Sequence, residues 1–499
     1  MEYVSTRGTV PPVPSKKAIL KGIAVDSGLY VPSVFPFLGA NPFADLHQPS
    51  YTARATRILK AFLTDYREEE LLSACQEAYG ENFDSPSTAP VRSLGDGLSV
   101  LELWHGPTLA FKDMALQIMP RLLTPAIQSQ GEGYKILILV ATSGDTGKAA
   151  LEGFADVENV SIFVFYPHQG VSEMQRLQMV TQRGANVGVC GVMGNFDDAQ
   201  SGVKRIFSEP AMNARLEAVH YRLSSANSIN WGRLVPQIAY YFTAYEEMVI
   251  AGEVSRGQPI NICVPTGNFG NILAAYYAAR CGLPVAKLVC ASNINNVLTD
   301  FIRTGVYDRK REFHKTESPS MDILISSNLE RLLFELVGRQ AEPVSDWMTQ
   351  LTTEGRYRIP DDALDQLQSG FYGGYANRRE TSAAIREAFE ERGYLLDPHS
   401  AVGYRVLERY REKTGDSRPA LLVSTASPFK FNQAVLEALG RDITGKDEFS
   451  LLEELSSLWG RRVPLPLSEL KTLPEKHTGV CGKQEMAEVL YRFLGLTGQ

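Results

Sequence analysis

A repeated unit of three parts constrains this chain more than any other feature: a short apolar run, a glycine-bearing turn and a helical pattern. The clearest runs begin at Lys135, Val160, Ala185, Ile260 and Pro419. They are short and rich in β-branched residues, so we interpret them as buried strands. Strands that alternate with helices predict an α/β fold with open, mostly parallel sheets and helices on both faces. Ligands of such sheets bind at the carboxyl ends of the strands, where these turns lie.

The bulk properties of the chain exclude several other classes of protein. Its 499 residues are too many for one compact core, and a formal net charge of −7 has the wrong sign for a nucleic-acid-binding protein. The six cysteines include no CxxC pair, so we expect no metal site. No apolar run approaches the roughly 18–20 residues that cross a bilayer, and the N-terminus lacks the apolar core of a signal peptide. We therefore expect a cytoplasmic protein with no nucleic-acid or membrane partner.

Four regions are predicted along the chain. Residues 1–95 form an N-terminal domain of mixed structure. A main α/β domain follows in two parts, 96–225 and 226–435, and the polar, mixed-charge residues at about 300–400 predict a helical insertion in the second part. Residues 436–499 predict a helical C-terminal extension.

A lysine in the segment HGPTLAFKD, residues 105–113, is the first candidate for a reactive group. Lys112 follows a Gly-Pro turn and opens a helical pattern. A helix N-terminus favours anions, so a lysine at this place needs another reason to be present. Formation of a Schiff base with an aldehyde cofactor is such a reason, since imine chemistry requires a lysine whose amine can be neutral. A solvated surface lysine is the alternative, and these residues alone do not decide between them.

Two glycine-rich turns each join an apolar run to a helical pattern: ATSGDTGK at 141–148 and PTGNFGN at 265–271. Such turns leave backbone N–H groups free to hold an anion at the positive end of the helix. A carboxylate or a phosphate would suit either turn, and an ordinary strand–helix joint is the alternative. Two such turns at one sheet edge fit ligands that carry several anionic groups. A nucleotide-dependent oxidoreductase would also use them, but the P-loop spacing and the GxGxxG fingerprint are both missing.

The segment SANSINWGR, residues 225–233, is a candidate phosphate site. Its asparagines and serines supply hydrogen-bond donors, and Arg233 adds a guanidinium fork suited to a phosphate monoester. A helix N-cap is the alternative, because serine and asparagine are preferred caps. Three further segments, SPSMD at 318–322, DPHSAVG at 397–403 and STASP at 424–428, are more typical of turns when each is taken alone.

Taken in this order, the segments resemble threonine synthases, which are pyridoxal-phosphate enzymes with the fold of the tryptophan synthase β subunit (fold type II). The resemblance runs from Ser5 to Phe431 and rests on an ordered set of motifs: STRG, HGPTLAFKD, TSGDTG, GNFDD, NSIN with Arg233, PTGNFGN, SPSMDI, SNLER and DPHSAVG. One such motif means little, but the ordered set is specific. One place departs from the pattern, because many relatives have a histidine where this chain has Ser427. Thr425 is retained, so the departure puts in doubt only a role of that histidine.

The resemblance implies a role for each motif residue. Lys112 would hold pyridoxal phosphate as a Schiff base, Thr425 would face the pyridine nitrogen and Asp145 would lie near the phenolic oxygen. The PTGNFGN turn would hold the cofactor phosphate through Gly267, Asn268, Phe269, Gly270 and Asn271. The substrate carboxylate would be bound by Ser143 and Thr146, and the substrate phosphate by Asn227, Ser228 and Arg233, with Thr108 assisting near the Schiff base.

The resemblance also implies a reaction. The chain would convert O-phospho-L-homoserine and water to L-threonine and phosphate, as a monomer or a homodimer. Its first main-domain part would carry the lysine and the substrate site, and the second would hold the cofactor phosphate. A phospho-lyase that releases 2-oxobutyrate from the same substrate is an alternative. A catalytically silent binding protein is another, although such a protein has no chemical need for the lysine and the two anion turns.

Overall fold

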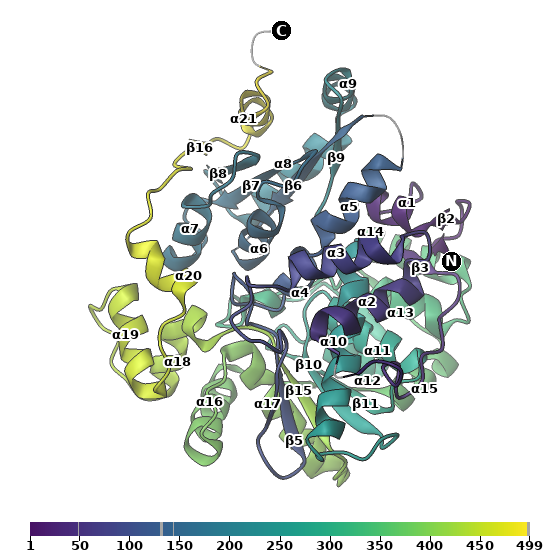
Figure 1. Ribbon diagram of the computed structural model, residues 1–499, viewed down its shortest axis with the longest axis vertical. Helices are drawn as coiled ribbons and strands as arrows, with labels where there is room; N and C mark the ends of the chain where they lie inside the picture. Colours follow the sequence, from purple (N-terminus) through teal and green to yellow (C-terminus); the bar gives the residue numbers. More distant parts are fainter. Residues whose placement is uncertain (48, 130–132, 143, 497–499) are drawn as a thin grey trace.

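The computed structural model describes residues 1–47, 49–129, 133–142 and 144–496. The chain folds into two lobes that are each built on a parallel sheet (Figure 1). One lobe contains β6 to β9 at the top of the view, and the other contains β5, β10, β11 and β15 below it. The predicted α/β class, with open and mostly parallel sheets, is therefore confirmed.

The six-stranded sheet has the order β14-β11-β10-β15-β5-β4, and each neighbouring pair is parallel except β4 and β5. Alternate residues of its central strand point to opposite faces. Ile262 and Val264 join the core on one face, whereas Cys263 joins the core on the other, beside helix α17. The strands of this sheet are β4 (Val91–Ser93), β5 (Leu98–Glu102), β10 (Ile260–Pro265), β11 (Val285–Ser292), β14 (Phe371–Tyr375) and β15 (Ala420–Ser424).

The five-stranded sheet has the order β16-β8-β7-β6-β9, and all its pairs are parallel. β8 is buried along its whole length, as is typical of a parallel strand covered on both faces. The strands of this sheet are β6 (Lys135–Ala141), β7 (Val160–Pro167), β8 (Val187–Val192), β9 (Tyr221–Ser224) and β16 (Val480–Cys481).

Helices cover the sheets, and the longest of them, α10, is buried along most of its length. It packs against α2, α4 and α11, while α17 packs under β10, β11 and β15. The main-domain helices are α4 (Asp113–Leu116), α5 (Met119–Gln128), α6 (Asp145–Phe154), α7 (Glu173–Val180), α8 (Phe196–Ser208), α9 (Pro210–Ala218), α10 (Trp231–Ile250), α11 (Gly270–Arg280), α12 (Val297–Thr304), α13 (Leu329–Leu336), α14 (Ala341–Thr353), α15 (Asp361–Gly370), α16 (Arg378–Arg392) and α17 (Pro398–Thr414). Short 3₁₀ turns are η1 (Pro319–Met321) and η2 (Pro428–Phe431), and β12 (Val306–Asp308) pairs with β13 (Arg356–Arg358).

The two ends of the chain lie on the outside of these lobes. The N-terminal residues form a small antiparallel sheet of order β2-β1-β3 with three helices. Of the C-terminal helices, α18 and α19 lie near α16, and α21 lies beside the five-stranded sheet (Figure 1). The N-terminal elements are β1 (Glu2–Ser5), β2 (Val13–Pro14), α1 (Ser15–Lys21), β3 (Tyr30–Pro32), α2 (Tyr51–Phe62) and α3 (Glu68–Ala78). The C-terminal elements are α18 (Asn432–Ala438), α19 (Glu448–Trp459), α20 (Leu465–Ser468), η3 (Glu469–Lys471) and α21 (Met486–Phe493).

Four of the described strands lie in segments that the sequence pattern predicts as helical, among them the three-residue strands β12 and β13, which pair with each other within 300–400. β14 falls within 300–400 and pairs with β11, and β16 falls within 436–499 and pairs with β8. The sequence of β14 is FYGGY, whose glycines weaken a strand pattern, and β16 is only two residues long. Neither strand therefore gives a clear period-two signal. The four predicted domain ranges stay a prediction, since strand pairing does not say which segments fold as units.

Candidate active site

The predicted motifs lie at the carboxyl ends of strands in both sheets. HGPTLAFKD follows β5, PTGNFGN follows β10 and Thr425 follows β15 in the six-stranded sheet. TSGDTG follows β6 and SANSIN follows β9 in the five-stranded sheet. Each sheet therefore presents its turns at the edge where ligands of parallel sheets bind.

Lys112 is a buried lysine whose amine faces a hydroxyl and a carboxylate. It precedes α4, and its Nζ donates to Ser320 Oγ at 2.8 Å and lies 3.7 Å from Asp145 Oδ2. Burial lowers the pKa of the Lys112 amine to about 8, the charge of Asp145 opposes this shift, and the charges of Lys430 and Arg233 add to it. A buried amine with this pKa can lose its proton near neutral pH, which a lysine nucleophile or base requires.

Asp145 lies between two lysines at the first turn of α6. Its Oδ1 pairs with Lys430 Nζ at 2.9 Å, and its Oδ2 faces Lys112. Burial by itself raises the pKa of the Asp145 carboxyl, but the charges of Lys430 and then Lys112 outweigh it and hold the pKa far below its usual range. Asp145 is therefore a permanent negative charge beside the reactive amine.

Arg233 is a buried guanidinium on the first turn of α10 that has no carboxylate partner in the described part of the chain. Its Nη1 donates to the carbonyl of Ala226 at 2.7 Å, and its Nε is buried without a partner. Burial lowers the pKa of Arg233 to about 10, and no carboxylate contributes to that shift. A buried arginine without a counter-charge is costly, so this geometry fits a site for an anionic ligand.

The turn after β6 is organised by Thr142. Its Oγ1 accepts hydrogen bonds from the N–H groups of Gly144, at 3.0 Å, and Gly147, at 2.9 Å. Gly144 has a φ of 145°, which favours glycine. Thr146 is half-buried on the first turn of α6. Ser143, a predicted ligand of the substrate carboxylate, lies outside the described residues.

The PTGNFGN turn leads directly into α11. Phe269 precedes the helix in the left-handed region, with a φ of 65°, and Gly270 is the first helical residue. Asn271 Oδ1 accepts from the hydroxyls of Tyr240 at 2.7 Å and Tyr241 at 2.5 Å, so its Nδ2 faces elsewhere and is buried without a partner among the described residues. Free N–H groups of a first helical turn and an unpaired amide suit a bound phosphate.

The same turn is joined to the candidate phosphate segment by Asn328. Its Nδ2 donates to the carbonyl of Asn268 at 3.0 Å and to that of Ser228 at 3.3 Å. Asn227 is exposed, and its Oδ1 accepts from Ser228 Oγ at 3.2 Å. Asn230, to which the sequence assigns no role, is the N-cap of α10. The capping role considered for this segment therefore belongs to Asn230.

Backbone contacts place Thr425 beside the lysine segment. The N–H of Phe111 donates to the carbonyl of Thr425 at 2.8 Å, and the N–H of Ser427 donates to the carbonyl of Leu109 at 3.0 Å. Ser427, where many relatives have histidine, is fully buried, and its hydroxyl has no partner among the described residues. Thr425 is therefore fixed by its main chain at the end of β15.

Thr108 contacts groups that surround Lys112. Its N–H and its hydroxyl donate to the two carboxylate oxygens of Asp113 at 2.8 and 2.6 Å, and its carbonyl accepts from Lys430 at 2.9 Å. Burial raises the pKa of the Asp113 carboxyl to about 6, and the hydrogen bonds from Thr108 oppose that shift. Thr108 stabilises the start of α4 in this structure, and its predicted contact near the Schiff base stays a prediction.

Four residues that shape this site have no role predicted from the sequence: Thr142, Ser320, His399 and Lys430. Thr142, Ser320 and His399 lie within motifs that the sequence analysis singled out, but those motifs were not predicted to meet. Lys430 is buried beside Asp145 although no local pattern marks it. A contact between residues more than two hundred positions apart gives no periodic signal in a single sequence.

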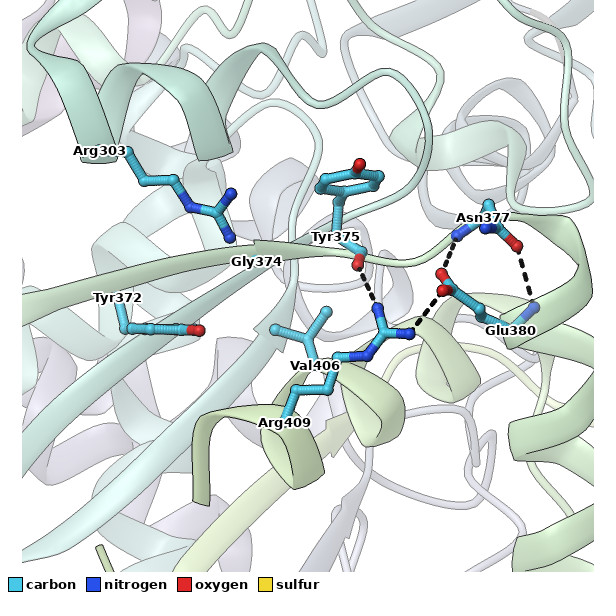
Figure 2. A pocket seen from close by; sticks show the side chains of 8 residues that line it. All are labelled: Arg303, Tyr372, Gly374, Tyr375, Asn377, Glu380, Val406 and Arg409. Atoms are coloured by element: carbon cyan, nitrogen blue, oxygen red, sulfur yellow. Dashed lines mark hydrogen bonds and ion pairs between the residues drawn. The ribbon is translucent and has the colours of Figure 1, made fainter. Parts of the chain in front are cut away.

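A small cavity elsewhere contains none of these residues. Its volume is about 160 Å³, and it lies at the edge strand β14, where Arg409 of α17 donates to the carbonyl of Tyr375 and to Glu380 (Figure 2). Asn377 caps α16 at the same place. Arg409, Glu380 and Asn377 are thus joined by hydrogen bonds at this cavity, which lies apart from the predicted site residues.

Among the described residues, no cluster of three or more His, Cys, Asp or Glu side chains could hold a metal ion. Within the same residues, no helix is both long enough and apolar enough to span a bilayer.

Three family profiles match successive parts of the chain. They are "Threonine synthase N terminus" over residues 2–79, "Pyridoxal-phosphate dependent enzyme" over 86–426 and "Threonine synthase, C-terminal" over 400–485. The chain belongs to the threonine synthase family. Curated members agree with this assignment. Threonine synthase of Pseudomonas aeruginosa is 40% identical over 439 residues, which cover 88% of this chain and 90% of that protein. The Saccharomyces cerevisiae enzyme is 34% identical over 501 residues, which cover 95% and 94%.

Human threonine synthase-like 1 is also similar, with 40% identity over 456 residues. The match covers 88% of this chain and 60% of that protein, so the chain spans about 60% of the length of that relative. Among solved structures, PLP-bound threonine synthase from Brucella melitensis aligns with a TM-score of 0.87 at 36% identity, and yeast threonine synthase with 0.88 at 33%. Each alignment covers 99% of both chains. The predicted fold type II is therefore confirmed.

The cofactor of this family is pyridoxal phosphate, and the residues around Lys112 fit it. Lys112 supplies a buried amine that can be neutral, and PTGNFGN supplies a helix N-terminus with a buried, unpaired Asn271 amide. A Cβ at Gly267 would overlap the carbonyl oxygen of Ser320, so the turn passes that backbone as closely as a glycine allows. The site contains three cationic side chains and two carboxylates. The cations are Lys112, Lys430 and Arg233, and the carboxylates are those of Asp145 and Asp113. That excess of positive charge suits an anionic cofactor and substrate.

Proposed function

We propose that this chain converts O-phospho-L-homoserine and water to L-threonine and phosphate, as a carbon–oxygen lyase acting on a phosphate ester. The observation that carries the proposal is Arg233, a buried guanidinium that has no carboxylate partner among the described residues. Its charge also lowers the pKa of Lys112. The family assignment supports the reaction class, and the buried arginine supports a substrate that carries a phosphate beside the reactive amine.

Pyridoxal phosphate, when bound, supplies an electron sink for negative charge on the carbon atoms of an amino acid. We propose that it is held covalently by Lys112, at its phosphate by Gly267, Asn268, Phe269, Gly270 and Asn271, at its pyridine nitrogen by Thr425 and near its phenolic oxygen by Asp145. A hydroxyl at the pyridine nitrogen is a weak hydrogen-bond partner compared with a carboxylate, so that nitrogen stays largely unprotonated. The weaker electron sink disfavours transamination as a side reaction.

Lys112 would move the protons of the reaction. Its pKa of about 8 leaves a substantial neutral fraction near neutral pH, and a base is most efficient when its pKa lies near the working pH. The amine would take a proton from Cα of the substrate, and a second proton would leave Cβ. Phosphate would depart from Cγ with the electrons of the C–O bond, and a proton would be delivered to Cγ, which becomes the methyl group. The hydroxyl of water would then add at Cβ and a proton would return to Cα, which gives threonine.

Arg233 would stabilise the leaving group, with Asn227 and Ser228 as further contacts to the substrate phosphate. The negative charge on the phosphate oxygens grows as the bond to Cγ breaks. A contact that tightens in the transition state raises the rate, whereas one that is equally strong throughout does not. Ser143 and Thr146 are proposed to bind the substrate carboxylate, which orients Cα toward the amine.

Product analysis tests this proposal directly. Purified protein loaded with pyridoxal phosphate is incubated with O-phospho-L-homoserine, and phosphate, threonine and 2-oxobutyrate are measured together. Equal amounts of phosphate and threonine are expected. Phosphate released with 2-oxobutyrate would identify a phospho-lyase instead, and no phosphate release by yellow, cofactor-loaded protein would identify a catalytically silent relative.

A further inference from the structure

Two segments that the proposed function leaves without a role, 318–322 and 397–403, meet behind Lys112. Ser320 lies in η1, and its hydroxyl oxygen accepts from the Lys112 amine at 2.8 Å. The backbone N–H of Ser320 donates to Nε2 of His399 at 3.2 Å. A buried imidazole on α17 is thus in contact with the residue that holds the reactive amine.

The partners of His399 fix its tautomer. A backbone amide can only donate, so Nε2 must present a lone pair to Ser320. The ring hydrogen is then on Nδ1, which donates to Asp397 Oδ1 at 2.8 Å. The backbone N–H of His399 donates to the same oxygen at 2.9 Å, and only 2% of the residue is exposed. His399 is therefore a neutral hydrogen-bond acceptor held in place by the N-cap residue of its own helix.

Ser320 is also confined from the opposite side. A Cβ at Gly267 would overlap the carbonyl oxygen of Ser320, and the carbonyl of Gly267 is held by Ser326 Oγ at 2.7 Å. The PTGNFGN turn is therefore in close contact with the carbonyl group of Ser320, and His399 accepts a hydrogen bond from its N–H. With both ends of the residue fixed, its hydroxyl keeps one position relative to Lys112.

The carboxylate that orients His399 also reaches Thr425. Asp397 Oδ2 accepts from the N–H of Ser400 at 3.3 Å and from its hydroxyl. Ser400 Oγ in turn accepts from the N–H of Thr425 at 3.3 Å. One carboxylate at the start of α17 thus orders both the residue behind Lys112 and the residue assigned to the pyridine nitrogen.

We propose that Ser320 and His399 are positioning residues for Lys112, and that Asp397 couples them to Thr425. The hydroxyl of Ser320 holds the Lys112 amine in one position. Because it accepts a hydrogen bond from the amine, it also favours the protonated form of Lys112. His399 reaches the amine through its hydrogen bond to Ser320. This inference rests on the proposed function, because the position of Lys112 matters only if the amine moves protons. The charged groups that face Lys112 are Asp145 on α6, Lys430 on η2, Arg233 on α10 and Asp113 on α4, and the test leaves all four unchanged.

The test compares five variants of the pyridoxal-phosphate-loaded protein: Ser320→Ala, Ser320→Thr, His399→Leu, His399→Gln and the control Ser318→Ala. Ser318 is a buried serine of the same segment whose hydroxyl bonds Asn293 and Thr316 instead of Lys112. Steady-state kinetics give kcat and KM, and the pH dependence of kcat gives the midpoint of its acidic limb. A pH titration of the visible absorbance of the protein without substrate gives a second midpoint.

We expect Ser320→Ala and His399→Leu to lower kcat about tenfold to hundredfold with little change in KM, since misplacing a reacting group by about 1 Å costs that much. Loss of the acceptor disfavours the protonated nitrogen of Lys112. The acidic limb of kcat and the absorbance midpoint should therefore both move to lower pH, by roughly half a unit to one unit. Ser320→Thr keeps a hydroxyl and His399→Gln keeps an acceptor, so both should return toward wild type, and Ser318→Ala should match wild type.

Two results would overturn the inference. One is an absorbance midpoint that stays at the wild-type pH in Ser320→Ala or in His399→Leu. The other is an equal shift in Ser318→Ala, which would indicate a general loss of local structure. If the Ala or Leu variant does not fold, the Ser320→Thr and His399→Gln variants still test the inference. Loss of kcat in both would show that neither a hydroxyl at 320 nor a hydrogen-bond acceptor at 399 is sufficient, which would contradict it. The absorbance titration needs no substrate, so an inactive wild type would refute the proposed reaction without changing this comparison.

Discussion

Among individual residues, Lys112, Lys430 and Arg233 share one property: burial separates them from water, and two nearby carboxylates do not neutralise all three. Their order of importance for the proposed reaction follows from their contacts. Lys112 is in contact with a hydroxyl and a carboxylate, Lys430 is paired with Asp145 at 2.9 Å, and Arg233 has no carboxylate partner in the described chain. Lys112 is therefore free to react, Lys430 sustains the charge of Asp145, and Arg233 is available to an anion.

Replacing Lys112 by alanine should abolish turnover and remove the visible absorbance of the purified protein. The amine is the attachment point proposed for the cofactor and the base for its substrate, so no other group replaces both functions. Absorbance spectra and phosphate release measure the two effects. Lys60→Ala is a suitable control, because that amine donates to the carbonyl of Tyr66 in the N-terminal domain. Mass spectrometry after borohydride treatment that finds the cofactor on another lysine would refute the assignment.

Replacing Arg233 by alanine should lower kcat/KM for O-phospho-L-homoserine by roughly tenfold to 150-fold. The loss corresponds to one charge-assisted hydrogen bond, which is worth about 1.5–3 kcal/mol. Arg256→Ala is the matched control. Arg256 follows the end of α10 and forms an ion pair with Glu246, near the end of that helix opposite to Arg233. Steady-state kinetics give the answer, and a variant with unchanged kcat/KM would remove Arg233 from the phosphate site.

Among structural elements, the turns that follow strands could be predicted and the contacts between them could not. A glycine-rich turn between an apolar run and a helical pattern is a local signal, so ATSGDTGK and PTGNFGN could be placed at sheet edges from the sequence. The position of Lys430 beside Asp145 depends on η2 and α6 meeting across the lobes, which no local pattern encodes. The same holds for Ser320 and His399, 79 positions apart. Strand β14 was missed because two of its five residues are glycine.

The PTGNFGN turn gives a prediction at this scale. Gly267→Ala should weaken binding of pyridoxal phosphate, because the added Cβ would overlap the carbonyl oxygen of Ser320 and must displace either the turn or η1. Backbone atoms cannot move aside as a flexible side chain can, so we expect at least a tenfold rise in the dissociation constant, or about 1.4 kcal/mol. Fluorescence titration of the cofactor-free protein measures it.

Gly370→Ala provides the comparison for that variant. Gly370 ends α15, and a Cβ there would meet no atom within 4 Å. Its cofactor affinity should equal that of the wild type. Equal affinities for all three proteins would show that the close approach of Gly267 to Ser320 is unimportant for the cofactor.

For the whole molecule, the N-terminal segment is joined by hydrogen bonds to the segment proposed to bind the substrate phosphate. Arg331 of α13 is fully buried and donates to the carbonyl of Tyr30 at 3.0 Å and to that of Ile229 at 2.6 Å. Its neighbour Glu330 accepts from Thr6 at 2.6 Å and pairs with Arg7 at 3.1 Å. The motifs STRG and SNLER, far apart in the sequence, thus form one polar joint. We expect that joint to link the stability of the N-terminal segment to the geometry of the site.

Arg331→Met should therefore weaken both folding and substrate binding. Methionine fills much of the space but leaves the carbonyls of Tyr30 and Ile229 without their donors, and each buried group left unpaired costs about 1–3 kcal/mol. We expect the free energy of unfolding in urea to fall by on the order of 3 kcal/mol and KM for O-phospho-L-homoserine to rise. Arg358→Met removes an exposed ion pair to Asp361 and should change unfolding by less than about 1 kcal/mol. If Arg331→Met unfolded at the wild-type urea concentration, the joint would be a contact without energetic weight, and the N-terminal domain would have to be held by its apolar face alone.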